Sequence, residues 1–291
     1  MDKLIIGVTA NEGATRQRNR HVPWTPAEIA VDAARCREQG AAIVHYHVRT
    51  AEGAFDHGAQ ACAGTIAQVK ARCDILQVPA LANTPGATAA DRLANVLPGA
   101  ADPRTRPDFI AVEPGCANMD LFDPVGKALL STDRTFINTF ATVRFMLQRL
   151  RENGISPYFA SFNVSWTRAI EALLATGDIT PPMLLMLVLG GPSFIAAHPA
   201  DVAGLNAHLA FLPRGATIHW LASCHGANAL DVAAAAIEAG GHIALGLGDH
   251  PYDELGEPTN ADLVARVCRL ARERGREPAT PADVRQMLAG A

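Results

Sequence analysis

The stretch that decides the fold is Ala41-Ala42-Ile43-Val44-His45-Tyr46-His47-Val48-Arg49. Its apolar, β-branched beginning and its polar end are typical of a strand that runs from a buried core to an open edge. Side chains alternate across a strand, so His45, His47 and Arg49 project from one face. Gly40 marks a turn before the strand and residues 50–58 form a loop after it. The histidines therefore lie at the carboxyl end, where α/β proteins bind their ligands.

The histidine pair predicts a site for a divalent cation. Two imidazoles two residues apart on a strand reach one cation without backbone distortion, and neutral imidazole is a favoured ligand of zinc. The alternative is a pair of hydrogen-bonded histidines in the core. The place of His45 and His47 at the end of the strand favours the metal site.

Short apolar segments alternate with segments of helical periodicity along the whole chain. The predicted strands are residues 4–10, 41–49, 75–79, 109–113, 156–162, 183–189, 217–222 and 242–247. The predicted helices are residues 25–39, 59–71, 88–97, 138–153, 166–175, 200–211, 229–239 and 260–274, with a last short helix from Thr280. Eight such units predict one α/β domain over residues 1–291, a single (β/α)8 TIM barrel. The alternative, a doubly wound sheet, is disfavoured because Asn11-Glu12-Gly13-Ala14 lacks the glycine spacing of a dinucleotide fold.

The composition excludes several classes of partner. The chain has 291 residues, 49% of them hydrophobic, and a net charge of −4 without a basic run, which argues against nucleic acid. The longest apolar run, residues 183–189, is too short to cross a membrane, and we expect no signal peptide. Six dispersed cysteines without a Cys-x-x-Cys pair fit a reducing cytoplasm. We expect a cytoplasmic homo-oligomer, with apolar outer positions such as Trp220 and Phe211 in its interface.

A closed barrel would gather polar residues from several loops around the histidines. The loops that follow the strands meet at one end of such a barrel. They carry Asn11, Glu12, Asn83, Thr84, Glu113, Asn163, Gly190, Gly191, Ser223, His225, Asn228, Asp249 and His250. Each of these could simply structure its own loop. Their convergence on the histidine pair indicates a site for a small molecule.

Several motifs, in the same order, resemble the β-keto acid cleavage enzymes. They are Val-Pro-Trp-Thr-Pro-Ala-Glu-Ile-Ala at 22–30, the histidine stretch at 40–49, Leu-Val-Leu-Gly-Gly at 187–191, Gly-Gly-His-Ile-Ala-Leu-Gly-Leu-Gly-Asp at 240–249, Asn-Ala-Asp-Leu-Val at 260–264 and Ala-Thr-Pro-Ala at 279–282. Members of that family are zinc-dependent (β/α)8 barrels. They exchange an acyl group between a β-keto acid and acetyl-CoA, giving acetoacetate and a new acyl-CoA. The resemblance implies these two substrates and a bound zinc ion.

The resemblance also assigns roles, and this chain departs from it at several positions. By the resemblance His45 and His47 are zinc ligands and Asp249 is an acidic catalytic residue, although Asp249 could instead cap the turn at 248–251. A family glutamate that binds zinc is Gly248 here, a family arginine is Ala244, and a family glutamate on the fifth strand falls at Ala160. The family loop Ser-Thr-Gly-Gly is Asn83-Thr84-Pro85-Gly86 here.

The missing glutamate leaves the metal without a third protein ligand. Catalytic zinc sites usually have three protein ligands and a water. Gly248 cannot supply a carboxylate, but a closed barrel brings strand 8 beside strand 1, which ends near Glu12. We therefore predict Glu12 as the third ligand, with His250 in reserve. Alternatively, Glu12 pairs with Arg16 or Arg18 in its own loop.

These observations predict a metal-dependent enzyme of β-keto acid cleavage. The metal would polarise the keto group and a carboxylate would move a proton, with Asp249 and Glu113 as the catalytic candidates. Arg49 could bind the substrate carboxylate bidentately, or pair with a neighbouring acid. The other predicted substrate contacts are Asn83, Thr84, Gly190 and Gly191. Two alternatives are a metal-dependent hydrolase or C–C lyase on the same barrel, and a barrel that binds a small molecule without turnover.

Overall fold

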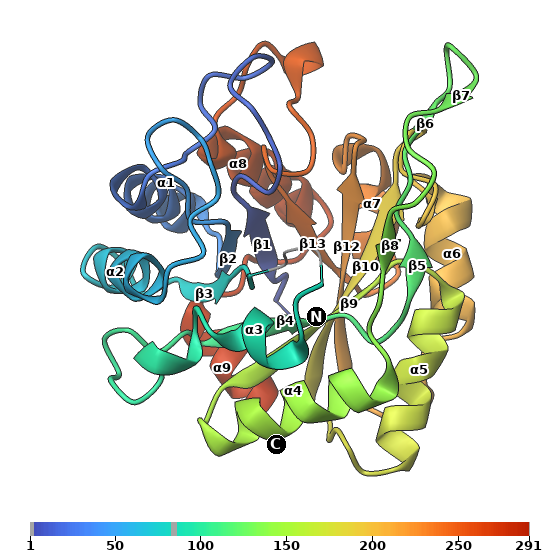
Figure 1. The fold of residues 1–291 in the computed structure, drawn as a ribbon. Helices are drawn as coiled ribbons and strands as arrows, with labels where there is room; N and C mark the ends of the chain where they lie inside the picture. Colours follow the sequence, from blue (N-terminus) through green and yellow to red (C-terminus); the bar gives the residue numbers. More distant parts are fainter. Residues whose placement is uncertain (1–2, 83–85, 291) are drawn as a thin grey trace.

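Eight parallel strands form a nearly closed barrel in the computed structural model, which describes residues 3–82 and 86–290 (Figure 1). The strands are β1 (Ile6–Thr9), β2 (Ile43–Tyr46), β3 (Leu76–Pro79), β4 (Phe109–Val112), β9 (Ser156–Ser161), β10 (Met183–Gly190), β12 (Ile218–His225) and β13 (His242–Leu245). They pair in the order β3-β2-β1-β13-β12-β10-β9-β4. The two end strands, β3 and β4, lie side by side, and the backbone amide of Gln77 in β3 donates to the carboxylate of Asp108, just before β4, over 3.0 Å. The predicted (β/α)8 barrel is confirmed.

Helices cover the outside of the barrel and one of its ends, most of them within two residues of the predicted bounds. They are α1 (Pro26–Gln39), α2 (Ala59–Lys70), α3 (Ala89–Leu93), α4 (Phe140–Glu152), α5 (Val164–Ala175), α6 (Val202–Ala210), α7 (Leu230–Glu238), α8 (Asn260–Glu273) and α9 (Pro281–Ala289). Local chemistry sets these bounds. Thr25 and Glu28 form a capping box at the start of α1, and Gly40 ends that helix in the left-handed region, at φ 116°. Helix α3 is shorter than predicted because Pro98 cannot continue the α-helical hydrogen bonds, and a 3-10 turn takes its place.

The last helix closes one end of the barrel. Val284 of α9 packs against the lower barrel residues Ile5, Ala42 and Leu76. Figure 1 shows α9 beneath the strands, on the side away from the loops that follow them. The barrel interior is therefore covered at its amino end. A ligand must enter from the carboxyl end, where the histidine stretch finishes.

The segment after β4, which had the pattern of a loop, forms a two-part arm. Strands β5 (Ala117–Asn118) and β8 (Thr135–Phe136) pair near the barrel, and β6 (Phe122–Asp123) and β7 (Ala128–Leu129) pair farther out. In Figure 1 the arm, drawn in green, projects beyond the barrel mouth. Strands of two residues are too short to show alternation in a sequence.

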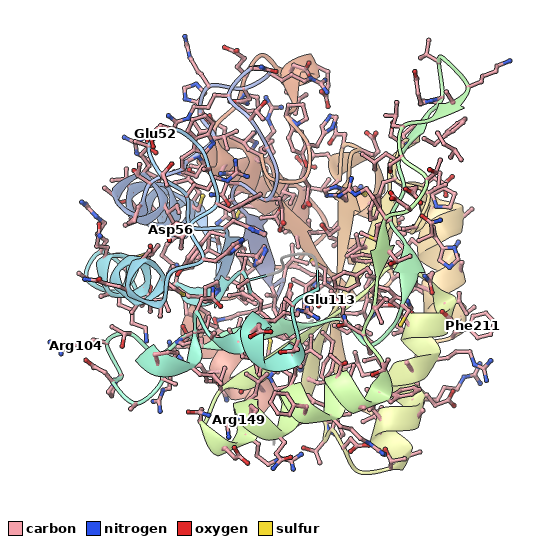
Figure 2. The ribbon with its side chains drawn as sticks, viewed as in Figure 1. Glu52, Asp56, Arg104, Glu113, Arg149 and Phe211 are labelled. Carbon is pink, nitrogen blue, oxygen red and sulfur yellow. The ribbon has the colours of Figure 1, made fainter. Side chains whose placement is uncertain are left out.

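The surface carries scattered apolar side chains. Phe211, at the edge of the molecule in Figure 2, is exposed, as are Val125, Leu129 and Leu130 of the arm. Trp220, the other outer position predicted for an interface, is buried and lies against Gly241. In the part of the chain that the structure describes, no helix is long and apolar enough to span a membrane.

Candidate active site

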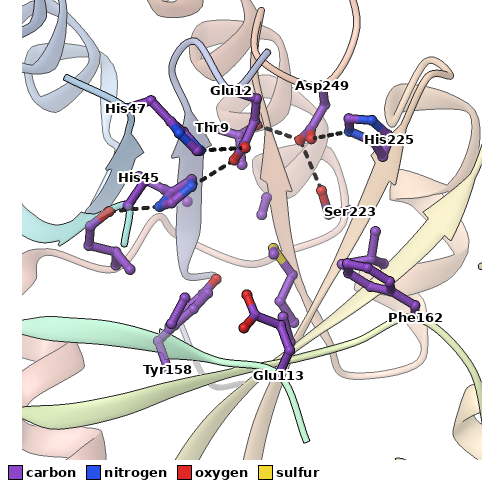
Figure 3. A pocket seen from close by; sticks show the side chains of 18 of the residues that line it. Thr9, Glu12, His45, His47, Glu113, Tyr158, Phe162, Ser223, His225 and Asp249 are labelled. Carbon is purple, nitrogen blue, oxygen red and sulfur yellow. Dashed lines mark hydrogen bonds and ion pairs between the residues drawn. The ribbon is translucent and has the colours of Figure 1, made fainter. Parts of the chain in front are cut away.

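A cavity of about 280 Å³ opens at the carboxyl end of the barrel (Figure 3). Each of the eight barrel strands contributes to its wall. One side is polar and carries Glu12, His45, His47, Ser223, His225 and Asp249. Tyr158 and Phe162 lie across the cavity from Glu12 and Asp249, with Glu113 beside them (Figure 3), and Met119, Phe136, Met186 and Arg92 also line the cavity. The cavity therefore has a reactive side and a side that can receive an apolar group.

Glu12, His45 and His47 form a candidate metal site. The Glu12 carboxylate lies between the two rings, with Oε1 2.7 Å from His45 Nε2 and Oε2 2.8 Å from His47 Nε2. Ligand atoms of all three residues lie within 4.8 Å of one another. His45 Nδ1 donates to the Val78 carbonyl over 2.7 Å, because a carbonyl oxygen can only accept, and Nε2 is left as the ligand atom. Two imidazole nitrogens and a carboxylate fit a divalent cation that keeps an open position.

The charges of this group depend on one another. Burial lowers the pKa of His45, but the Glu12 carboxylate outweighs that effect and raises it to about 9. Burial raises the pKa of Glu12, yet the adjacent His45 and His47 rings hold it well below its ordinary value. The carboxylate is therefore ionised at neutral pH. An anionic oxygen aimed between two ring nitrogens is what a cation site requires.

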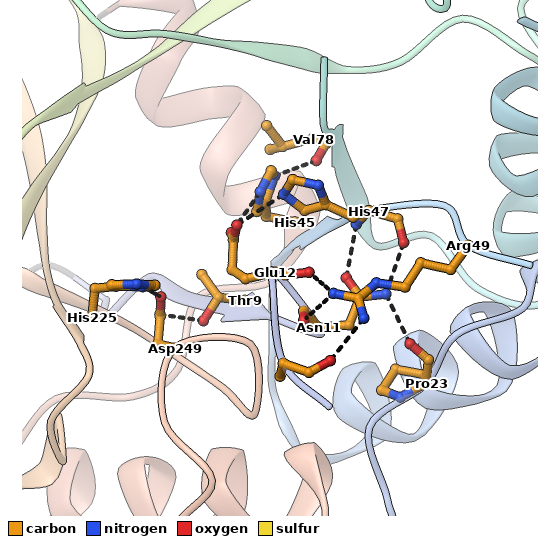
Figure 4. A network of polar contacts seen from close by, with 11 residues as sticks. Thr9, Asn11, Glu12, Pro23, His45, His47, Arg49, Val78, His225 and Asp249 are labelled. Atoms are coloured by element: carbon orange, nitrogen blue, oxygen red, sulfur yellow. Dashed lines mark hydrogen bonds and ion pairs between the residues drawn. The ribbon is translucent and has the colours of Figure 1, made fainter. Parts of the chain in front are cut away.

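Arg49 and Asn11 hold the turn that presents Glu12 (Figure 4). Glu12 has a backbone φ of 27°, a region that residues other than glycine rarely adopt. The buried guanidinium of Arg49 donates to the carbonyl oxygens of Asn11 (3.1 Å), Glu12 and Ala14 (2.7 Å). The Asn11 side chain accepts from the His47 amide and donates to the His47 carbonyl, both over 2.8 Å. The residues that follow β2 thus hold in place the Glu12 carboxylate, which faces His45 and His47.

Asp249 is the centre of a second polar group, beside the first on the polar side of the cavity. Its Oδ2 accepts hydrogen bonds from Thr9 Oγ1 (2.5 Å) and Ser223 Oγ (3.1 Å), and its Oδ1 lies 3.4 Å from His225 Nδ1 (Figure 3). Burial lowers the pKa of His225, but the hydrogen bond and charge of Asp249 raise it above its ordinary value. The sequence placed Ser223 and His225 at the mouth without connecting them to Asp249. The signal was present, because both side chains alternate along the polar end of β12 as His45 and His47 do along β2.

The other predicted site residues lie in different surroundings. Glu113 lines the cavity, 3.4 Å from Arg92 Nη2, and Arg92 also donates to Asn138. The described residues that line the cavity do not include Arg49, Gly190 or Gly191. The two glycines instead allow close backbone packing, since a Cβ would lie 2.2 Å from the Phe194 carbonyl oxygen or 2.1 Å from that of Gly226.

Four further candidates lie away from this metal site or outside the described chain. His250 Nε2 lies 3.1 Å from Glu254, in a separate group with Asp253. Asn83 and Thr84 fall outside the described residues. Asn163 caps helix α5 by accepting from the Trp166 amide.

The fold and this site define a (β/α)8 enzyme with a candidate metal site at the mouth of its barrel. Residues 3–289 match the family described as beta-keto acid cleavage enzyme, and the chain belongs to that family. It is 29% identical, over 99% of its length and 98% of the relative, to "3-keto-5-aminohexanoate cleavage enzyme" of Acetoanaerobium sticklandii. It is 26% identical, over 98% of its length and 96% of the relative, to "3,5-dioxohexanoate:acetyl-CoA acetone transferase" of Paraburkholderia graminis.

Solved structures support the same fold. The structure titled "Apo structure of ObcA" matches with a TM-score of 0.68 at 15% identity, over 92% of this chain and 65% of that one. A truncated 3-deoxy-D-arabino-heptulosonate 7-phosphate synthase from Thermotoga maritima matches with a TM-score of 0.52 at 12% identity, over 94% and 89%. At these identities the likeness concerns the barrel alone.

Proposed function

We propose that the protein is a zinc-dependent acyltransferase that exchanges an acyl group between a β-keto acid and acetyl-CoA. The observation that carries the proposal is the Glu12 carboxylate between His45 and His47, in a family member that has no carboxylate at Gly248. The site keeps three protein ligands, as a catalytic zinc site needs. When bound, the ion would act as a Lewis acid toward the keto oxygen of the substrate.

The names of the relatives indicate which part of the substrate meets the metal site. They include 3-keto-5-aminohexanoate, 3,5-dioxohexanoate and 3-oxoadipate, which share a 3-oxo acid and differ at the other end. We place the 3-oxo acid at Glu12, His45 and His47, beside the Asp249 group. The variable end then extends toward the apolar side of the cavity.

Glu113 takes a different role in this arrangement from the one predicted. In Figure 3 it lies across the cavity from Glu12 and Asp249, beside the apolar side. We therefore propose that Glu113 contacts the variable end of the substrate rather than the reacting carbons. Ala160 and Ala244 also line the cavity, and their small side chains leave room where the family carries larger residues.

The experiment is an acyl-transfer assay on the zinc-loaded protein. Acetyl-CoA and 3-oxo acids with cationic, neutral and anionic ends are supplied, and new acyl-CoA is detected by mass spectrometry. We expect a product that requires both acetyl-CoA and zinc and that disappears in His45→Ala. No acetyl-CoA-dependent product from any 3-oxo acid would overturn the proposal.

A second candidate is a metal-dependent lyase or hydrolase on the same site. The observation that favours it is Ala160 and Ala244 in the cavity wall, where the family carries a glutamate and an arginine. Cleavage of a 3-oxo acid by the zinc-loaded protein without acetyl-CoA would identify this activity. A barrel without bound metal or turnover would instead be a binding protein.

A further inference from the structure

We propose that His225 is the base that moves the substrate proton, and that Asp249 is a positioning residue that acts through it. The inference rests on the proposed function, because it concerns a proton of a β-keto acid. It differs from the sequence-based prediction, in which the carboxylate of Asp249 moves that proton. Three features of the polar side of the cavity support it.

The first feature is the state of the Asp249 carboxylate. Its side chain is 8% exposed, and three donors surround it: the hydroxyls of Thr9 and Ser223 on Oδ2, and the imidazole of His225 on Oδ1. Donors on both carboxylate oxygens occupy the positions from which a carboxylate would accept a substrate proton. Both oxygens already have protein partners, so a substrate carbon would have to displace one of them.

The second feature is the exposure and direction of His225. Its side chain is 41% exposed and lines the cavity, so it is the accessible member of the pair. Because Nδ1 is the nitrogen directed at Asp249, the contact favours the tautomer in which Nδ1 carries the proton and Nε2 has a free lone pair. Among the described residues, Nε2 has no hydrogen-bond partner.

The third feature is the packing that holds the ring. The Phe194 ring lies edge-on to the imidazole, with centroids 4.8 Å apart and an interplanar angle of 67°. The charged groups that face His225 are Asp249, from the loop after β13, and Glu12, at the end of β1. Both are carboxylates and favour the protonated ring. The surroundings therefore support an imidazole that accepts a proton and releases it again.

The proposed step takes a proton from the carbon between the keto group and the carboxylate. The C–H bond breaks, an N–H bond forms at His225 Nε2, and the electron pair becomes the enolate of the keto acid. After acyl transfer the same nitrogen returns a proton to that carbon, so the turnover has no net proton change. Asp249 stays anionic and balances the charge of the imidazolium, as the aspartate does in a serine–histidine–aspartate triad.

The test follows exchange of this proton with solvent, separately from acyl transfer. Zinc-loaded protein is placed in D2O with acetoacetate as the probe and without acetyl-CoA, and the methylene signal is followed by ¹H NMR above the uncatalysed background. The variants are His225→Gln and Asp249→Asn, and His21→Gln is the matched control. His21 carries the same ring but is exposed and lies outside the cavity. Zinc content is measured for each protein.

We expect His225→Gln to lower exchange about 100-fold or more with unchanged zinc content, since general bases contribute 10²–10⁴-fold. His21→Gln should behave as the original protein. Asp249→Asn should exchange faster than His225→Gln, with the rise of its pH profile moved to lower pH, because the carboxylate that raises the pKa of His225 is gone.

The inference is overturned if His225→Gln catalyses proton exchange at the original rate, or if Asp249→Asn loses the exchange while His225→Gln keeps it. It is also overturned if the original protein does not catalyse the exchange. If the exchange depends on His225 but no acyl-CoA product forms, the proposed function would be wrong and the role of His225 as a base would stand. If His225→Gln still transfers the acyl group, the proposed function would stand and His225 would not be the base. If His225→Gln does not fold, ¹⁵N-histidine NMR of the original protein decides, because a proton on Nε2 with Nδ1 free would contradict the arrangement.

Discussion

Gly248 lies directly against the backbone of Glu12. A Cβ at Gly248 would be 2.7 Å from the Glu12 amide nitrogen and 2.8 Å from the Thr9 carbonyl oxygen. The Gly248 amide also donates to that Thr9 oxygen, over 3.0 Å. The turn that brings Glu12 to the histidines therefore occupies the space that a side chain at Gly248 would need. The two positions depend on each other sterically.

The first prediction follows from this contact. Restoring the family residue with Gly248→Glu should not improve zinc binding, and it should lower the free energy of unfolding by about 1–3 kcal/mol, as overpacking does. Urea unfolding and zinc titration measure the two effects. Gly64→Ala is the control, because a Cβ there meets nothing within 4 Å and a helical alanine should be neutral or stabilising. Tighter zinc binding in Gly248→Glu would contradict the steric argument.

Glu12→Gln should weaken zinc binding at least about 100-fold while the protein stays folded. The substitution keeps the size of the side chain and removes the anionic ligand between His45 and His47. Competition with a chelator of known affinity gives the dissociation constant. Glu52→Gln is the matched control, because that carboxylate is exposed and does not line the cavity. Full zinc occupancy in Glu12→Gln, together with loss in His45→Ala, would show that Glu12 is not a ligand.

Arg49→Lys should lower both stability and zinc affinity. A lysine has no planar fork, so it cannot serve the carbonyls of Asn11, Glu12 and Ala14 at once. We expect a loss of about 2 kcal/mol in unfolding free energy and of about 10-fold in zinc affinity, typical of residues that support a ligand. Arg104→Lys, on an exposed loop, should change neither. A change in substrate KM with unchanged zinc affinity would instead support the predicted contact with substrate.

Glu113→Gln should change which β-keto acid is preferred more than how fast the best one reacts. Glu113 lies on the side of the cavity away from Asp249, so its charge acts on the variable end of the substrate (Figure 3). The ratio of kcat/KM between substrates with cationic and neutral ends should shift by about 10-fold, with kcat for the neutral one within about 3-fold. A uniform fall in kcat for every substrate would restore the catalytic role predicted for Glu113.

His208→Gln should make the protein less sensitive to acid. Burial, and then the charge of nearby His198, lower the pKa of His208 from 6.5 to about 4. The folded state therefore favours the neutral ring. Its contribution to the free energy of unfolding is fully present above about pH 6.5 and is lost as the pH falls toward 4. At pH 5 the loss is on the order of 2 kcal/mol. Unfolding at pH 7 and pH 5 should show a smaller fall for the variant, and equal falls would contradict the assignment.

The elements of the fold could be read from local sequence because local chemistry determines them. The strand at residues 41–49 ends in polar residues, Thr25-Pro26-Ala27-Glu28 fixes the start of α1, and Gly40 ends it. Capping boxes at Thr259 and Thr280 do the same for α8 and α9. The alternation of His45 and His47 also placed both rings on the face that lines the cavity. Each of these features depends on residues a few positions apart, so it needs no knowledge of the tertiary structure.

The partners of the site residues were decided by the tertiary structure. Ser223 and His225 are more than twenty residues from Asp249 in sequence, and Thr9 is 240 residues from it, so only barrel closure brings their donors onto one carboxylate. Arg49 was predicted on the same strand face as the histidines, but its guanidinium donates to the backbone carbonyls of the turn at residues 11–14. The sequence by itself determined the strands, the caps and the metal-binding residue types. The register of the closed barrel decided which side chains meet, because contacts between distant segments depend on the packing of the whole sheet.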